Sequence, residues 1–218
     1  MRCLLSLPLL ALCVALSYSP VVAEEKKAEE GFKPLFNGKD LVGWKTFFAE
    51  KDADPAKTLI VKDGVIHCTG KPFGYFYTEK SFKNYVIRYD WRYPAEQPEK
   101  TTLNSGLLVH ITGPHKNWPH SIEAQGRYMD HGKIFPIGFA KDAKVEKKDD
   151  DAARKKALKA KEEWHTTEMT CNADGSFVVK INGIEVASGK SELTEGPIGF
   201  QSEGAAIDFR NIRIKEMK

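Results

Sequence analysis

Apolar and polar residues alternate along most of the chain, with a period of two residues rather than the 3.6 of a helix. In residues 85–92 the apolar and aromatic side chains share one side and the charged ones the other: Tyr85, Ile87, Tyr89 and Trp91 against Arg88, Asp90 and Arg92. Similar short runs occupy residues 74–80, 105–113, 120–128, 163–171, 197–203 and 205–217. The series predicts an all-β fold, an antiparallel β-sandwich or jelly roll.

Two dipeptides mark the tight turns of this fold. Asp63-Gly64 lies in the middle of residues 58–70, and Asn182-Gly183 lies in the middle of residues 177–189. Asp, Asn and Gly tolerate the positive φ that two-residue hairpin turns require. Each of the two segments is therefore predicted to form a β-hairpin.

The last predicted strand changes its pattern halfway along. Ile207 and Phe209 share one parity, whereas Ile212 and Ile214 share the other. A strand without irregularity would turn one of these pairs towards solvent. An extra residue near Asn211, forming a β-bulge, would return all four side chains to the core.

Residues 141–163 break the alternation. The segment is rich in lysine, acidic residues and alanine and has no strong apolar stripe. Alanine, lysine and glutamate favour helix, so its second half could form a short solvated helix. We interpret the segment as an exposed insertion between strands, helical or loop in structure.

The first 23 residues have the features of a secretory signal peptide. Arg2 precedes a short apolar run, and Val21 and Ala23 are the small residues expected before a cleavage site. We expect cleavage after Ala23, a charged leader at residues 24–30, one folded domain at residues 31–218, and no membrane-spanning segment afterwards. The predicted location is secreted or periplasmic.

The charge balance argues against a nucleic-acid partner. The chain has 33 Lys and Arg against 30 Asp and Glu, a net charge of +3, and loss of Arg2 with the signal peptide lowers this to +2. The two signs are interspersed, without the basic patch that nucleic-acid binding requires. Removal of the signal peptide also leaves only Cys68 and Cys171, which could form one disulfide or remain buried thiols.

The polar face of the strand at residues 120–125 holds the leading catalytic candidate. Glu123 lies between Ser121 and Gln125 on that face, while Ile122 and Ala124 take the other. Glycosidases of the common kind need two carboxylates roughly 5 to 10 Å apart. Jelly-roll glucanases carry them on an E-x-D-x-E strand, whereas this strand has a single acid. If Glu123 is catalytic, we therefore expect it to move a proton rather than to attack the sugar.

Other polar and aromatic residues are candidates for ligand contacts. The charged side chains of Arg88, Asp90 and Arg92 could line a groove, or they could form ordinary cross-strand ion pairs. His110 shares a parity with Leu108 and Asn104. Exposed aromatics could stack on a sugar ring. The set of binding candidates is Arg88, Asp90, Arg92, Asn104, His110, Trp118, His120, Gln125, Tyr128, His131 and Gln201.

No cofactor or metal is expected from these motifs. The spacings of the histidines, and of Cys68 and Cys171, match no compact metal-ligand pattern. A divalent cation such as calcium has only weak support, because Asp52 and Asp54 fall well short of the six to eight oxygen ligands that calcium takes.

Several motifs occur in one order from Gly31 to Lys218: GFKPLFNGKDLVGW, the NSG at 104–106, the E-x-Q at 123–125, the EW at 163–164, the NG at 182–183, and GPIGFQSEG followed by FRNIRIKEM. In these the chain resembles the 3-keto-disaccharide hydrolase domain family. The resemblance implies a concanavalin-like or laminin-G-like jelly roll that is exported and acts on oxidised sugars.

The resemblance implies a hydrolase that cleaves a glycosidic bond of a 3-keto-disaccharide or 3-keto-glycoside. The route would be proton abstraction, elimination and addition of water, with Glu123 as base or acid and Arg92, His110 or Gln125 as hydrogen-bond donors. Two alternatives remain open, because fold does not fix function. One is a noncatalytic carbohydrate-binding module, and the other is a structural or protein-interaction domain.

Overall fold

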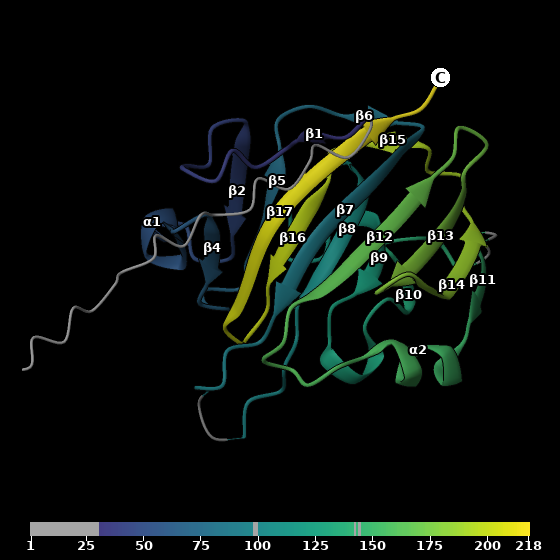
Figure 1. The fold of residues 1–218 in the computed structure, drawn as a ribbon. Coiled ribbons are helices and arrows are strands. Elements are labelled where there is room, and N and C mark those ends of the chain that lie inside the picture. The colour runs from purple at the N-terminus through teal and green to yellow at the C-terminus, as the bar shows by residue number, and fades with distance from the viewer. Residues whose placement is uncertain (1–30, 98–99, 142, 144) are drawn as a thin grey trace, which may run out of the picture.

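The alternating segments form antiparallel strands in two stacked sheets (Figure 1). A computed structural model describes residues 31–218 except 98–99, 142 and 144. The predicted signal peptide and charged leader lie outside the described residues. In the described part of the chain, no helix is long and apolar enough to cross a membrane.

The first sheet has nine strands within the described residues. In spatial order they are β11 (Glu146–Asp149), β14 (Ile184–Lys190), β13 (Ser176–Ile181), β12 (His165–Cys171), β7 (Tyr85–Arg92), β17 (Ile207–Glu216), β4 (Val65–Cys68) and β3 (Leu59–Lys62), with β1 (Lys33–Pro34) paired to β17.

The second sheet has six strands in the same part of the chain. In spatial order they are β10 (Ile134–Ile137), β9 (His120–Gln125), β8 (Gly106–Thr112), β16 (Gly199–Ser202), β5 (Gly74–Thr78) and β2 (Trp44–Phe48). A short pair, β15 (Glu195–Gly196) with β6 (Phe82–Lys83), forms a separate two-stranded sheet. The helical elements are α1 (Pro55–Thr58), η1 (Tyr128–Asp130) and α2 (Asp151–Ala157). The predicted all-β sandwich is confirmed.

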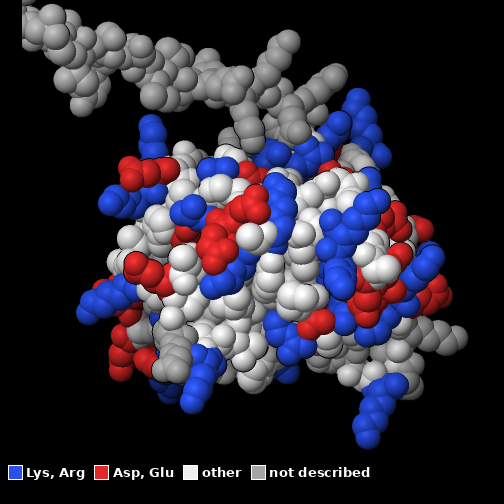
Figure 2. Space-filling model, turned by 60° about the horizontal axis from the view of Figure 1, so that its bottom comes forward, with Lys and Arg blue, Asp and Glu red and all other residues white. Residues whose placement is uncertain are grey.

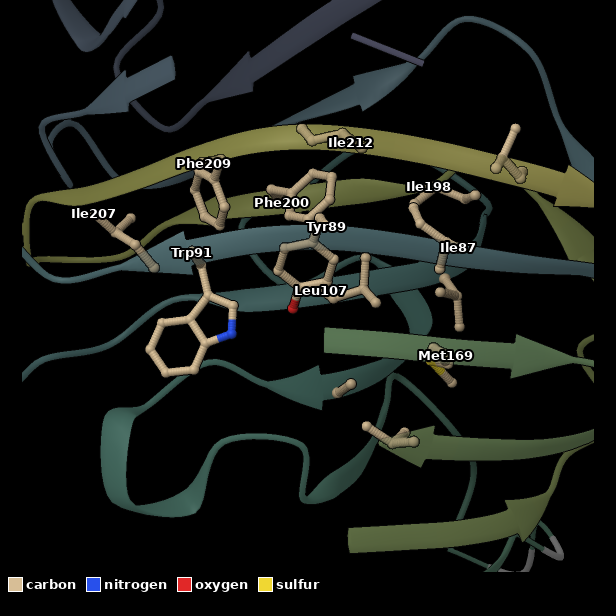
Figure 3. Packing of buried hydrophobic residues seen from close by; sticks show 14 of the residues in the cluster. Ile87, Tyr89, Trp91, Leu107, Met169, Ile198, Phe200, Ile207, Phe209 and Ile212 are labelled. Atoms are coloured by element: carbon tan, nitrogen blue, oxygen red, sulfur yellow. The ribbon is translucent and has the colours of Figure 1, made fainter. Parts of the chain in front are cut away.

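Aromatic side chains from both sheets meet in the core (Figure 3). Phe200 of β16 lies with its ring centroid 4.9 Å from that of Tyr89 on β7 and 5.0 Å from that of Phe209 on β17. All three are buried. Burial of such side chains stabilises the fold by roughly 1.5–3 kcal/mol each, so this contact is a major part of what joins the two sheets.

Both predicted hairpins and the predicted bulge are confirmed. Asp63 and Asn182 have φ of 51° and 50°, and each begins a two-residue turn, between β3 and β4 and between β13 and β14. In β17 the register against β7 shifts between Arg210 and Arg213, and Asn211 has φ of 51°. The shift places all the flanking isoleucines, and Phe209, in the core.

The segment at 141–163 is more firmly attached than a solvated insertion. Its β11 extends the first sheet, and α2 begins at a cap where Asp150 accepts a hydrogen bond from the Ala153 amide. Arg154 of α2 is only 1% exposed, and its Nε donates to the carbonyl of His131 at 2.9 Å. The helix is therefore docked by a buried guanidinium.

On the face drawn in Figure 2, basic and acidic side chains are interspersed among uncharged residues. Inside, Cys68 and Cys171 are free and buried, so the thiol alternative holds for this pair.

Candidate functional site

The site is built on the face of the six-stranded sheet that turns away from the main core. In β9, Ile122 and Ala124 belong to the core, and Glu123 between them takes the opposite face. The register places Leu108 of β8 beside Glu123, and Gly199 of β16 beside Leu108. Strands β9, β8 and β16 thus present one continuous surface.

Gly106, at the start of β8, provides the space in which two polar side chains meet. A Cβ at this position would come within 2.5 Å of Oε1 of Glu123 and closer still to Oε1 of Gln201. Both side chains are almost fully buried, and neither Oε1 atom has a hydrogen-bond partner among the described residues. Two acceptor oxygens thus converge on one point, which favours a proton or a ligand donor between them.

Burial controls the charge of Glu123. Loss of hydration raises the pKa of its carboxyl to about 8, and the nearby Glu203 carboxyl adds to the effect. Glu123 is therefore mostly protonated at neutral pH. A protonated carboxyl has an O–H that can donate to Oε1 of Gln201.

Glu203 lies two residues beyond Gln201 in the sequence, and the two line a small pocket with Trp118, Asn117 and Phe73. Burial raises the pKa of Glu203, whereas a hydrogen bond from the Trp118 side chain opposes that rise. The indole N–H is the donor in that bond. Trp118 and Phe73 remain 53% and 46% exposed, so two aromatic side chains are open to solvent at the edge of the carboxyl pair.

An aromatic wall adjoins the polar residues. The Tyr75 hydroxyl is hydrogen-bonded to Nδ1 of His115 at 2.7 Å, and the His115 ring lies 4.4 Å from that of Tyr77. A groove of about 660 Å³ runs along this wall and is lined by Phe47, Ala49, His115, Lys116, Asn117, Trp118, Ile137 and Gly138. Because Asn117 and Trp118 also line the small pocket, the groove and the carboxyl pair adjoin.

The structure brings three predicted residues together: Glu123, Gln201 and Trp118. Two others lie on the same strand. His120 packs against Phe139, and the side-chain Oε1 of Gln125 accepts a hydrogen bond from the backbone amide of Arg127. Asn104 lies just before β8, and its buried Oδ1 has no partner among the described residues.

The charged residues of β7 lie on the other sheet. Arg88 and Arg92 pair with Glu168 and Asp208, and the Nε–carboxylate distance is 2.9 Å in each case. Asp90, between them, pairs with neighbours of the same sheet. The structure therefore does not bring these three residues to Glu123. They form the cross-strand ion pairs that were the alternative interpretation.

Three further predicted residues are also separate from Glu123. In β8 the register shifts between Val109 and Thr112, and His110 has φ of 56°. This bulge removes His110 from the face expected from its parity, and its Nδ1 donates to the carbonyl of Leu193 at 3.0 Å. His131 stacks on Trp91 in the core, with 3.8 Å between the two ring centroids, and Tyr128 meets the Trp91 ring edge-on.

The described residues include no group of three or more His, Cys, Asp or Glu side chains placed to hold a metal ion. Asp54, a weak calcium candidate, accepts the Ala56 amide as the N-cap of α1. The side chains that line the small pocket carry carboxyl, amide, hydroxyl and aromatic groups.

Sequence reasoning missed Gly106, Glu203, Tyr75 and His115. Glu203 had a visible signal, because it continues the alternation of Gln201 on the polar face of residues 199–203. The other three depend on strand pairing between distant segments, and Gly106 was noted only as part of a motif.

Comparisons with known proteins identify the family of the chain. The model of a family described as the 3-keto-alpha-glucoside-1,2-lyase-like domain matches residues 31–215. No curated protein sequence matches the chain significantly.

Solved structures show the same fold. A candidate glycosyl hydrolase of Parabacteroides distasonis is 27% identical with a TM-score of 0.61, and the match covers 91% of this chain and 99% of that one. A second from the same organism is 22% identical with a TM-score of 0.60, covering 85% and 99%. A Bacillus licheniformis beta-glucanase is 13% identical with a TM-score of 0.51, covering 86% and 97%.

Proposed function

Because the chain belongs to the 3-keto-alpha-glucoside-1,2-lyase-like domain family, we propose that it cleaves the glycosidic bond of a 3-keto-disaccharide or 3-keto-glycoside by proton transfer, with Glu123 as a catalytic acid. The family match and the fold make it a carbohydrate-active jelly-roll protein. The likeness to a candidate glycosyl hydrolase at 27% identity supports cleavage of a sugar bond.

One observation carries the proposal: among the described residues, an oxygen of the buried Glu123 carboxyl has no hydrogen-bond partner, and the adjacent side-chain oxygen of Gln201 has none either. Leaving buried polar atoms unpaired costs about 1–3 kcal/mol each, and active sites are where such a cost is compensated by a ligand. A sugar hydroxyl or glycosidic oxygen would be such a ligand.

The chemistry of a 3-keto sugar suits this set of groups. The ketone at C3 acidifies the C2 hydrogen, so a base can remove it, the C1 leaving group departs, and water then adds to complete hydrolysis. This route needs a base and donors to the enolate and leaving-group oxygens. With a pKa near 8, Glu123 holds a transferable proton at neutral pH.

The surroundings of Glu123 suit a sugar ligand. Trp118 and Phe73 offer exposed aromatic surface, on which the apolar face of a sugar ring packs. Gln201 supplies an amide for hydroxyl contacts. We further propose that the protein is exported, on the basis of the signal-peptide pattern of residues 1–23.

The test compares a 3-keto-disaccharide with its unoxidised parent as substrates of the purified protein. We expect monosaccharide release from the keto sugar only, and a loss of about 10²–10⁴-fold in turnover for Glu123→Gln. Glu185→Gln, at an exposed position of β14 in the other sheet, is the matched control and should keep wild-type turnover.

Two outcomes would contradict the proposal. Unchanged hydrolysis by Glu123→Gln would remove Glu123 from the chemistry. Binding of either sugar with no turnover would instead identify the chain as a carbohydrate-binding module.

A further inference from the structure

We propose that Glu203 is the base of this reaction and Glu123 its acid, so that Glu203 gains one proton and Glu123 loses one during each bond cleavage. This inference rests on the proposed function and adds a catalytic residue to it.

Glu203 lies in the same part of the sheet face as Gln201 and Glu123. Gln201 and Glu203 are two residues apart at the end of β16, and both line the pocket edged by Trp118. Oε1 of Gln201 and Oε1 of Glu123 converge over Gly106. The carboxyl of Glu203 also lies close enough to that of Glu123 to disfavour its charge. The three polar side chains therefore occupy one small region of the sheet face.

The carboxyls of Glu123 and Glu203 have different environments. Glu123 is 6% exposed, and one of its buried oxygens has no hydrogen-bond partner in the part of the chain that the structure describes. Glu203 is less buried and accepts a hydrogen bond from the Trp118 indole, which stabilises its charged form. Two adjacent carboxyls do not both ionise readily, so the charge resides on the better supported one. Glu203 is then the carboxylate and Glu123 the neutral acid.

This assignment gives a balanced reaction. The Glu203 carboxylate takes the C2 hydrogen as a proton, and the C2–H electron pair forms an enolate with the C3 ketone. The enolate collapses as the C1–O bond breaks, which re-forms the ketone and creates a C1=C2 double bond. The departing oxygen takes the proton of Glu123. Glu203 now holds a proton, and Glu123 is ionised.

Addition of water reverses the two proton transfers. The water oxygen bonds to C1 and gives a proton to the Glu123 carboxylate, while C2 takes the proton held by Glu203. Both carboxyls return to their starting states. Water has replaced the leaving group at C1, and no oxidant or reductant is needed.

Trp118 contacts both Glu203 and the solvent. Its N–H binds Glu203, while more than half of the side chain stays open to solvent. A sugar that stacks on this ring is thereby placed beside the base. Trp118 is thus a positioning residue for Glu203.

The experiment measures turnover of a 3-keto-disaccharide from pH 4 to 10, together with carboxyl titration by ¹³C NMR of glutamate-labelled protein. Glu203→Gln should lower turnover by about 10²–10⁴-fold, and Glu203→Asp by less because it keeps a carboxylate. In Glu203→Gln the Glu123 titration should move to lower pH, because a neighbouring negative charge is removed. The acid limb of the kcat/KM profile should also disappear, which a purely structural role of Glu203 would not produce. Trp118→Phe should move the acid limb of the kcat/KM profile to higher pH.

The outcomes separate the two proposals. Wild-type turnover and an unmoved Glu123 titration in folded Glu203→Gln would overturn the base assignment while leaving the proposed function intact. Absence of turnover in the wild-type protein would instead refute the proposed function, and the base role with it. Thermal unfolding of each variant shows whether it is folded, and Glu185→Gln serves again as the control.

Discussion

Gly106 offers the sharpest test of the site, because its replacement adds one methyl group and no charge. In Gly106→Ala the new Cβ would lie within 2.5 Å of Oε1 of Glu123, whereas ordinary contacts begin near 3.4 Å. The Glu123 carboxyl must therefore retreat by about 1 Å, a displacement that can cost on the order of 100-fold in rate. We expect turnover to fall about 100-fold, or close to 2.7 kcal/mol in the activation barrier.

Stability should respond differently from activity. Gly106 does not have a positive φ, so alanine fits the backbone and gains about 0.4–1 kcal/mol by restricting the unfolded chain. That gain offsets part of the cost of moving the two side chains. We expect only a small change in Tm.

Gly43→Ala is the complementary control. Gly43 has φ of 86°, and nothing lies within 4 Å of an added Cβ. Alanine there should lose about 1–2 kcal/mol of stability through backbone strain and keep wild-type turnover below its Tm. The assays are turnover of a 3-keto-disaccharide and thermal unfolding. A Gly106→Ala protein with wild-type turnover would refute the reasoning that Glu123 and Gln201 must meet over this position.

The remaining predictions concern the core, the pH dependence of stability and the nine-stranded sheet. Phe200→Ala should lower the free energy of unfolding by about 3–5 kcal/mol in urea denaturation, because it leaves a cavity between the sheets. Folding raises the pKa of Glu123 from 4.5 to about 8. The contribution of this group to the free energy of unfolding is therefore fully present below pH 4.5 and is lost as the pH rises through 8. Between these pH values the free energy of unfolding of the wild-type protein should fall by up to about 1.4 kcal/mol per pH unit. Glu123→Gln removes the titrating group and should make this slope shallower, as measured by denaturation at each pH. Burial lowers the pKa of His131 from 6.5 to about 3, so the folded state should lose stability as pH falls from 6.5 towards 3, and His131→Asn should reduce that loss. Arg88→Met should keep turnover within about twofold and change stability by about 0–1 kcal/mol, since Arg88 and Glu168 pair with each other within the nine-stranded sheet, away from Glu123. A large loss of turnover would restore Arg88 to the site.

Local pattern was enough to predict some irregularities and not others. The bulge at Asn211 was predictable because Ile207 and Ile212 have opposite parities and both need burial. The bulge at His110 gave no such sign. Its neighbours are apolar on both parities, so a shift of one residue violates no pattern that the sequence shows.

The site was only partly predictable for a similar reason. Alternation identified Glu123 and could have identified Glu203. It could not show that β16 lies next to β8, which is what brings Gln201 over Gly106. Nor could it show that β7 belongs to the other sheet, which is what separates Arg92 from Glu123.

The placement of the four tryptophans makes the site visible to fluorescence. Trp44 and Trp91 are buried, and Trp164 lies against two guanidinium groups, 3.8 and 4.6 Å from their central carbons. Trp118 alone among the four is more than half exposed. A neutral quencher such as acrylamide should therefore act mainly on Trp118. A sugar that occupies the site would protect this emission, which gives a direct measure of binding that does not depend on turnover.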